Sequence, residues 1–170
     1  LVDNGAGLQA MPASTPSTYR GHVVGVADSR VAASLHNGQL DALIELHRNE
    51  FWVVQPLTDV LPNANPAEHA VYAVADSISK PEWLCGNQAF DMMPNVANIG
   101  GGDSGPRSPG NDLAEIAFDA DYEFYLKNGS SVPQTEADIE TVMNNIDLIY
   151  DRDCQINYVI TTIIVRSDVN

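Results

Sequence analysis

Basic residues are scarce in this chain of 170 residues, because Lys and Arg total 8 against 23 Asp and Glu, for a formal net charge of −15. So acidic a chain repels phosphate backbones, which excludes nucleic acid as a partner. No apolar run approaches the ~18 residues that cross a membrane, so we expect no membrane segment. The hydrophobic content of 44% is ordinary for a globular protein. We therefore expect one or two small folded domains.

Cysteine is also scarce, with only Cys85 and Cys154, which are too few for a disulfide framework. Cys85 lies in the segment Pro81-Glu82-Trp83-Leu84-Cys85-Gly86, between a proline and a glycine. Structural cysteines are common in secreted chains, so a disulfide between the two is one interpretation. A thiolate that binds a metal is the other.

A zinc-protease motif is absent, since no His-Glu-x-x-His occurs in the sequence. In that motif two imidazoles on one helical face bind zinc and the glutamate activates water. The acidic residues of 119–123 are more typical of a solvated strand edge than of a catalytic carboxylate pair. The histidines are spread over separate segments without metal-ligand spacing, and we expect them to be surface or hydrogen-bonded residues. These residues are Asp119, Asp121, Glu123, His22, His36, His47 and His69.

The first part of the chain has the pattern of short strands. Residues 1–18 are small and polar, and we expect a loose lead-in. From residue 19 strand-like runs alternate with turn signals, and Asn37-Gly38 is a strong hairpin signal because both residues tolerate positive φ. Apolar residues alternate strictly through 40–46, as in a half-buried strand. Five such runs predict an antiparallel β unit over residues 19–90.

The last part has a different pattern. Residues 91–112 are rich in Gly, Pro and Ser and predict a flexible linker, in which Arg107 is the only basic residue and the candidate processing site. A strand over 113–121 leads into residues 122–126. Thr135 is the expected N-cap of a helix, with Asp138 as its capping partner and an apolar face over 139–150. The β-branched run 158–166 predicts a strand buried on both faces. Strand, helix and strand over 113–170 predict a parallel β-α-β unit, and the fold class is α+β overall.

Four segments of the first part form an ordered set: Tyr19-Arg20-Gly21-His22-Val23, Asp28-Ser29-Arg30-Val31, Asn37-Gly38-Gln39-Leu40 and Glu68-His69-Ala70-Val71-Tyr72. In their order and in the gaps between them they resemble the prodomain of the reprolysin (adamalysin/ADAM) zinc metalloproteases, which are metzincins. Residues 116–122 and 145–150 are similar to the first strand and first long helix of that family's catalytic domain.

The resemblance implies that this chain is the N-terminal region of a secreted zymogen zinc metalloendopeptidase. Such an enzyme would act on protein or peptide substrates. Residues 19–90 would be a prodomain in contact with a catalytic domain that begins at 113. Cys85 would be the cysteine switch, an inhibitory ligand of a catalytic zinc whose other ligands lie beyond Asn170. Glu115 falls where some members bind a structural calcium. No catalytic residue is expected within this chain, which should be inactive alone.

The same residues are also consistent with a different class of protein. The chain could belong to a non-catalytic extracellular binding or assembly protein that reuses the scaffold. That alternative predicts no zinc signature elsewhere in the protein and a disulfide between Cys85 and Cys154. Whether the whole protein is an enzyme is therefore not decided by these residues.

Overall fold

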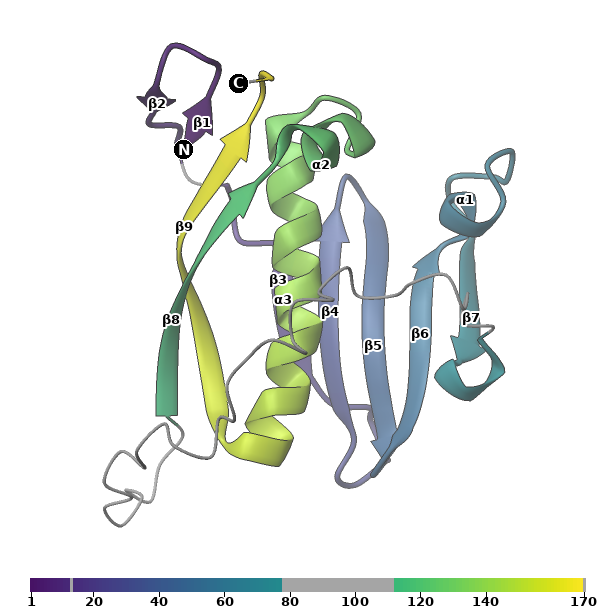
Figure 1. Cartoon of the computed structure of the whole chain (residues 1–170). Helices are drawn as coiled ribbons and strands as arrows, with labels where there is room; N and C mark the ends of the chain where they lie inside the picture. Colours follow the sequence, from purple (N-terminus) through teal and green to yellow (C-terminus); the bar gives the residue numbers. More distant parts are fainter. Residues whose placement is uncertain (13, 78–111, 170) are drawn as a thin grey trace, which may run out of the picture.

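The computed structural model describes residues 1–12, 14–77 and 112–169, and its fold is α+β. The long helix α3 lies between two β-sheets (Figure 1). The strands are β1 (Val2–Asp3), β2 (Leu8–Gln9), β3 (Thr18–Gly21), β4 (Arg30–His36), β5 (Gln39–His47), β6 (Glu50–Pro56), β7 (His69–Ala73), β8 (Asp112–Ala120) and β9 (Ile156–Arg166). The helices are α1 (Leu57–Val60), η1 (Val74–Asp76), α2 (Tyr122–Lys127) and α3 (Val132–Cys154).

The first sheet has the order β3-β4-β5-β6-β7, and every neighbouring pair in it is antiparallel. The predicted hairpin joins β4 to β5, where His36 pairs with Gln39 and the two turn residues adopt positive φ. Asn37 has φ 51° and Gly38 has φ 79°, the backbone that a tight two-residue turn requires. Within the described residues, the five antiparallel strands and the Asn-Gly turn are thus confirmed.

The second sheet has the order β2-β1-β9-β8 and contains the predicted β-α-β unit. β8 pairs with β9 in parallel from Asp112↔Ile156 to Ala120↔Val165, and helices α2 and α3 connect the two strands. A parallel pair needs such a crossover because the chain must return to the same end of the sheet.

The lead-in over residues 1–18 has more structure than its composition indicates. β1 pairs in parallel with β9, with Val2 opposite Val165 and Asp3 opposite Arg166, and β2 folds back on β1. Thr18 already belongs to β3. The edge of β9 offers backbone donors and acceptors to any extended segment, and side-chain periodicity does not report such pairing. A segment before the first sheet is therefore part of the second.

Residues 122–126, expected to continue from the strand, form the helix α2. Asp121 caps this helix, because its Oδ1 accepts a hydrogen bond of 2.8 Å from the backbone N–H of Phe124. Capping by an aspartate at this position satisfies a free N–H of the first turn and ends the strand at Ala120.

Helix α3 begins four residues before the predicted start. Its N-cap is Ser131, whose Oγ accepts from the Gln134 N–H at 3.4 Å, so the expected cap at Thr135 is wrong. Pro133 lies in the first turn, where its missing N–H leaves no bond unmade. Thr135 is fully buried inside the helix and donates its hydroxyl to the Ser131 carbonyl at 2.9 Å. Asp138 accepts from Asn128 at 3.3 Å instead of capping α3.

The second sheet has helices on only one side of β8 and β9 among the described residues (Figure 1). Val165 is fully buried, whereas Val159 of β9 is 42% exposed and Leu113 of β8 is 65% exposed. The expectation that 158–166 is buried on both faces is therefore wrong for the described chain, since one layer of helices covers one face only. No helix in the described ranges is both long and apolar enough to cross a membrane.

Candidate functional site

Helix α3 has an apolar face toward its own sheet. Ile139, Met143 and Ile146 are spaced by four and three residues, which places them on one side of the helix. Met143 lines a cavity with Tyr158 and Ile160 of β9, and the Tyr150 ring meets the Tyr158 ring edge-on at 5.4 Å. This face follows the predicted apolar stripe and joins the elements of the β-α-β unit.

The face of α3 that lies on the first sheet carries hydrogen-bonding side chains beside the buried Ala137 and Leu148. Asn144 donates hydrogen bonds to the backbone carbonyls of Ala33 at 2.9 Å and Tyr19 at 3.4 Å. The hydroxyl of Thr141 lies 3.2 Å from Nε2 of His36. The contact between α3 and the first sheet therefore depends on hydrogen bonds as well as on packing. We take this junction as the candidate functional site.

Asp147 of α3 connects three elements at the junction. Its Oδ2 accepts from Arg20 of β3 at 2.7 Å, and its Oδ1 accepts from the backbone N–H of Tyr158 of β9 at 2.6 Å. One helical turn further on, Asp151 pairs with Arg30 of β4 at 3.4 Å. Burial lowers the pKa of Arg20, and the charges of Asp147 and Asp151 oppose that shift. The arginines of the first sheet thus face carboxylates of the helix.

A third ion pair at the junction is nearly buried. Arg152 of α3 donates to Glu45 of β5, and their side chains are 13% and 3% exposed. The guanidinium also binds Asp153 at 2.7 Å and lies 5.3 Å from the centre of the Phe51 ring. The hydrogen bond to Asp153, followed by that to Glu45, raises the pKa of Arg152 above its ordinary value. The charge of Arg152 is therefore held permanently at this position.

The N-terminal strand is held by a separate cluster at the other sheet. Arg166 of β9 binds Asp119 of β8 through two hydrogen bonds of 2.8 Å and Asp3 of β1 through one of 2.5 Å. The hydrogen bond from Arg166 lowers the pKa of Asp119 below its ordinary value. Three neighbouring strands of the second sheet are joined through one guanidinium.

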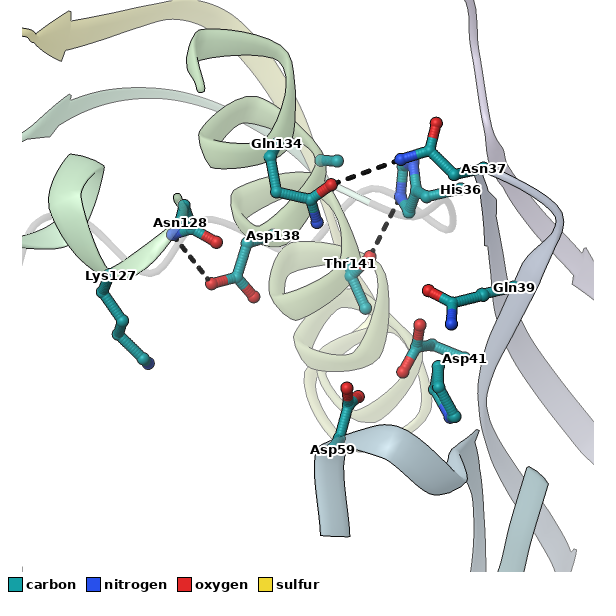
Figure 2. A pocket seen from close by; sticks show the side chains of 12 residues that line it. His36, Asn37, Gln39, Asp41, Asp59, Lys127, Asn128, Gln134, Asp138 and Thr141 are labelled. Carbon is teal, nitrogen blue, oxygen red and sulfur yellow. Dashed lines mark hydrogen bonds between the residues drawn. The ribbon is translucent and has the colours of Figure 1, made fainter. Parts of the chain in front are cut away.

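A polar cavity of about 410 Å³ lies within the junction, between β4, β5 and α1 on one side and α2 and α3 on the other. Figure 2 shows Asp41 and Asp59 on the side of the first sheet and Asp138 on α3, across the cavity. Burial raises the pKa of Asp41, and the charge of Asp59 raises it further, while His36 and His69 oppose the shift. The arrangement can take up a proton at Asp41 and is too polar to hold an apolar ligand.

The residues predicted for metal binding are not brought together in the described part of the chain. Glu115 is exposed on β8, and no group of three or more His, Cys, Asp or Glu among the described residues could hold a metal ion. Cys85 and Arg107 lie outside the described residues. Cys154, the alternative disulfide partner of Cys85, is exposed at the last residue of α3.

Asp119, Asp121 and Glu123 are exposed, as expected of a solvated edge. Two of them also have partners that the sequence did not indicate, since Asp119 binds Arg166 and Asp121 caps α2. His36 and His69 are hydrogen-bonded, the latter through Nε2, which accepts from the Leu40 N–H at 3.1 Å. The sequence did not indicate the junction itself. The one available signal was the charged residues of 41–45, which interrupt one face of an otherwise apolar strand.

Comparison with protein-family models gave no match, and comparison with curated proteins gave none either. The junction between the first sheet and α3 is therefore interpreted from its own geometry.

Proposed function

We propose that this chain is the N-terminal region of a secreted zymogen zinc metalloendopeptidase of the reprolysin kind. Residues 19–90 act as an inhibitory prodomain, and residues 113–170 begin the catalytic domain. The observation that carries the proposal is the ordered resemblance of residues 19–75 to that prodomain, followed by Cys85-Gly86. The β8-α3-β9 unit then stands where the catalytic domain would begin.

Cys85 is the residue of this chain to which we assign an inhibitory role. A catalytic zinc polarises and activates a water molecule at an open coordination position. A thiolate held over that position excludes the water, so the prodomain keeps the enzyme latent until the segment around Cys85 is displaced or cleaved. The remaining ligands would come from the rest of the protein, and Glu115 is the residue proposed for calcium. Arg107 is the proposed processing site in the linker.

The junction supports the proposal in a different way. An inhibitory segment acts only while it is held against the domain that it inhibits. Arg20, Arg30 and Glu45 of the first sheet each pair with a residue of α3, within the unit proposed to begin the catalytic domain. Such contacts fit a prodomain that is anchored on the catalytic part.

The test compares Cys85→Ala with Cys154→Ala in the full-length protein. We expect the Cys85 variant to cleave an unfolded protein substrate, or itself, without activation, and the Cys154 variant to remain as latent as the parent. An equally latent Cys85→Ala protein would refute the switch. Metal analysis of the full-length protein adds a second readout, because a protein without stoichiometric zinc would favour a non-catalytic extracellular binding or assembly protein. Mass spectrometry without reduction reports whether Cys85 is free or bonded to Cys154.

A further inference from the structure

Residues 1–77 contact residues 112–169 at two separate places. β1 is a strand of the second sheet, and the first sheet lies on α3, whose other face contacts β9 (Figure 1). Neither contact requires the chain between residues 77 and 112 to be intact, since both are made by described residues outside that range. The two parts are therefore interleaved in space although they are consecutive in sequence.

The first contact is a short parallel β-ladder between β1 and the edge of β9. The Val165 N–H donates to the Leu1 carbonyl at 2.9 Å, and the Ser167 N–H donates to the Asp3 carbonyl at 2.8 Å. The carboxylate of Asp3 adds its bond to Arg166. Backbone pairing of this kind is the way in which an extended segment adds to an open sheet edge.

The second contact is made between the first sheet and the face of α3 that lies on it. Four ion pairs join residues 1–77 to residues 112–169, three of them at α3 and the fourth at β9. Their partners are Arg20 with Asp147, Arg30 with Asp151, Glu45 with Arg152, and Asp3 with Arg166.

Leu148 and Ala137 are buried on the same side of α3, so this contact combines the ion pairs with a small apolar part. Interfaces between domains that can separate are more polar than the core of a domain.

We propose that residues 1–77 stay bound to residues 112–169 after the intervening chain is cut, and that ionic strength sets their release. Salt screens exposed charge pairs strongly and buried pairs weakly. Arg20 and Arg30 are 38% and 42% exposed, so their pairs weaken with salt, whereas the nearly buried pair of Glu45 weakens less. Cleavage and release are thus separate steps. The proposal goes beyond the proposed function and holds whether or not the whole protein is a peptidase.

The experiment places a recognition sequence for a specific protease within residues 91–112 of this chain and cuts it to completion. Size-exclusion chromatography of a dilution series then gives the dissociation constant at 0.05 M and 1 M NaCl. We expect one complex with the mass of the uncut chain at low salt, and about tenfold weaker association at high salt, the effect of screening two or three exposed pairs. Circular dichroism of the uncut protein verifies that each variant is folded.

The matched variants are Arg20→Gln with Arg30→Gln, against Glu68→Gln in the exposed loop before β7. The double variant should dissociate more readily at low salt and lose most of its salt dependence, while Glu68→Gln should behave as the parent. Separation of the cut parent at low salt would overturn the proposed retention. Equal salt dependence in the parent and the double variant would overturn the role of the ion pairs. Both outcomes are independent of zinc and of Cys85.

Discussion

Glu45 on β5 and Arg152 on α3 form an ion pair from which water is nearly excluded, although they are 107 residues apart in the sequence. The Glu45 side chain is 3% exposed, and it also accepts the Asn49 N–H at 3.2 Å in the turn to β6. A buried pair of this kind costs desolvation of both charges when it forms, so its net contribution is small. Removing one partner leaves the other charge buried without compensation.

We therefore expect Arg152→Leu to lower the free energy of unfolding by about 3 kcal/mol, the value for breaking a buried pair. The double variant Glu45→Leu with Arg152→Leu should recover most of that loss, because no unpaired charge remains. Urea unfolding of the parent, the two single variants and the double variant gives the coupling energy. Additive losses in the double variant would contradict a paired, water-excluded interaction.

Asp147 should matter more than the arginine that it binds. Asp147→Ala removes both the Arg20 contact and the acceptor for the Tyr158 N–H, so we expect a loss of about 2 kcal/mol in stability. Arg20→Gln removes only a partly exposed ion pair, and we expect at most about 1 kcal/mol. Thermal or urea unfolding of the two variants tests this order. A larger effect of Arg20→Gln would mean that the bond to β9 contributes little.

Removing either of two buried hydroxyls should change the stability of the fold, in opposite directions. Ser34 of β4 is 1% exposed, and its Oγ has no hydrogen-bond partner among the described residues. Ser34→Ala should raise the free energy of unfolding by about 1 kcal/mol, since an unpaired buried hydroxyl is unfavourable. Thr135 is also fully buried but donates to the Ser131 carbonyl, so Thr135→Val should lower stability by about 1 kcal/mol. The same denaturation assay measures both, and a destabilising Ser34→Ala would indicate an unseen partner.

Features encoded by neighbouring residues were predictable from the sequence. The Asn37-Gly38 turn follows from the positive φ that both residues tolerate, and the β8-α3-β9 unit follows from an apolar helix face flanked by two strands. The start of α3 was misplaced because Ser131 and Thr135 are both good caps. Pro133, which fits the first turn, favours the earlier one.

The junction could not be predicted, because it joins residues that are distant in the sequence. Alternation in residues 40–46 defines two faces of β5 but not which face α3 covers. Leu40 is 37% exposed, whereas Asp41 and Glu45 lie on the face toward α3. His36 and Thr141 meet across 105 residues, and β1 reaches β9 through backbone bonds that no side-chain pattern reports.

The cavity makes the stability of the junction dependent on pH through Asp41. Burial and the charge of Asp59 raise the pKa of Asp41 above its ordinary value of 3.8, and Asp138 acts in the same direction. The folded chain therefore binds the proton more tightly than the unfolded chain. The contribution of Asp41 to stability is lost as pH rises from the ordinary value through the raised pKa of the folded state.

We expect Asp41→Asn to be more stable than the parent at pH 7, where the buried charge is removed, and to lose that advantage below about pH 4, where both states of the parent are protonated. Asp119→Asn is the control of opposite sign. Arg166 lowers the pKa of Asp119, so Asp119 stabilises the fold at neutral pH and loses that contribution as pH falls through the lowered pKa. Urea unfolding of both variants across pH 3 to 7 measures the two trends. A pH-independent difference for Asp41→Asn would mean that its carboxylate is fully solvated in the cavity.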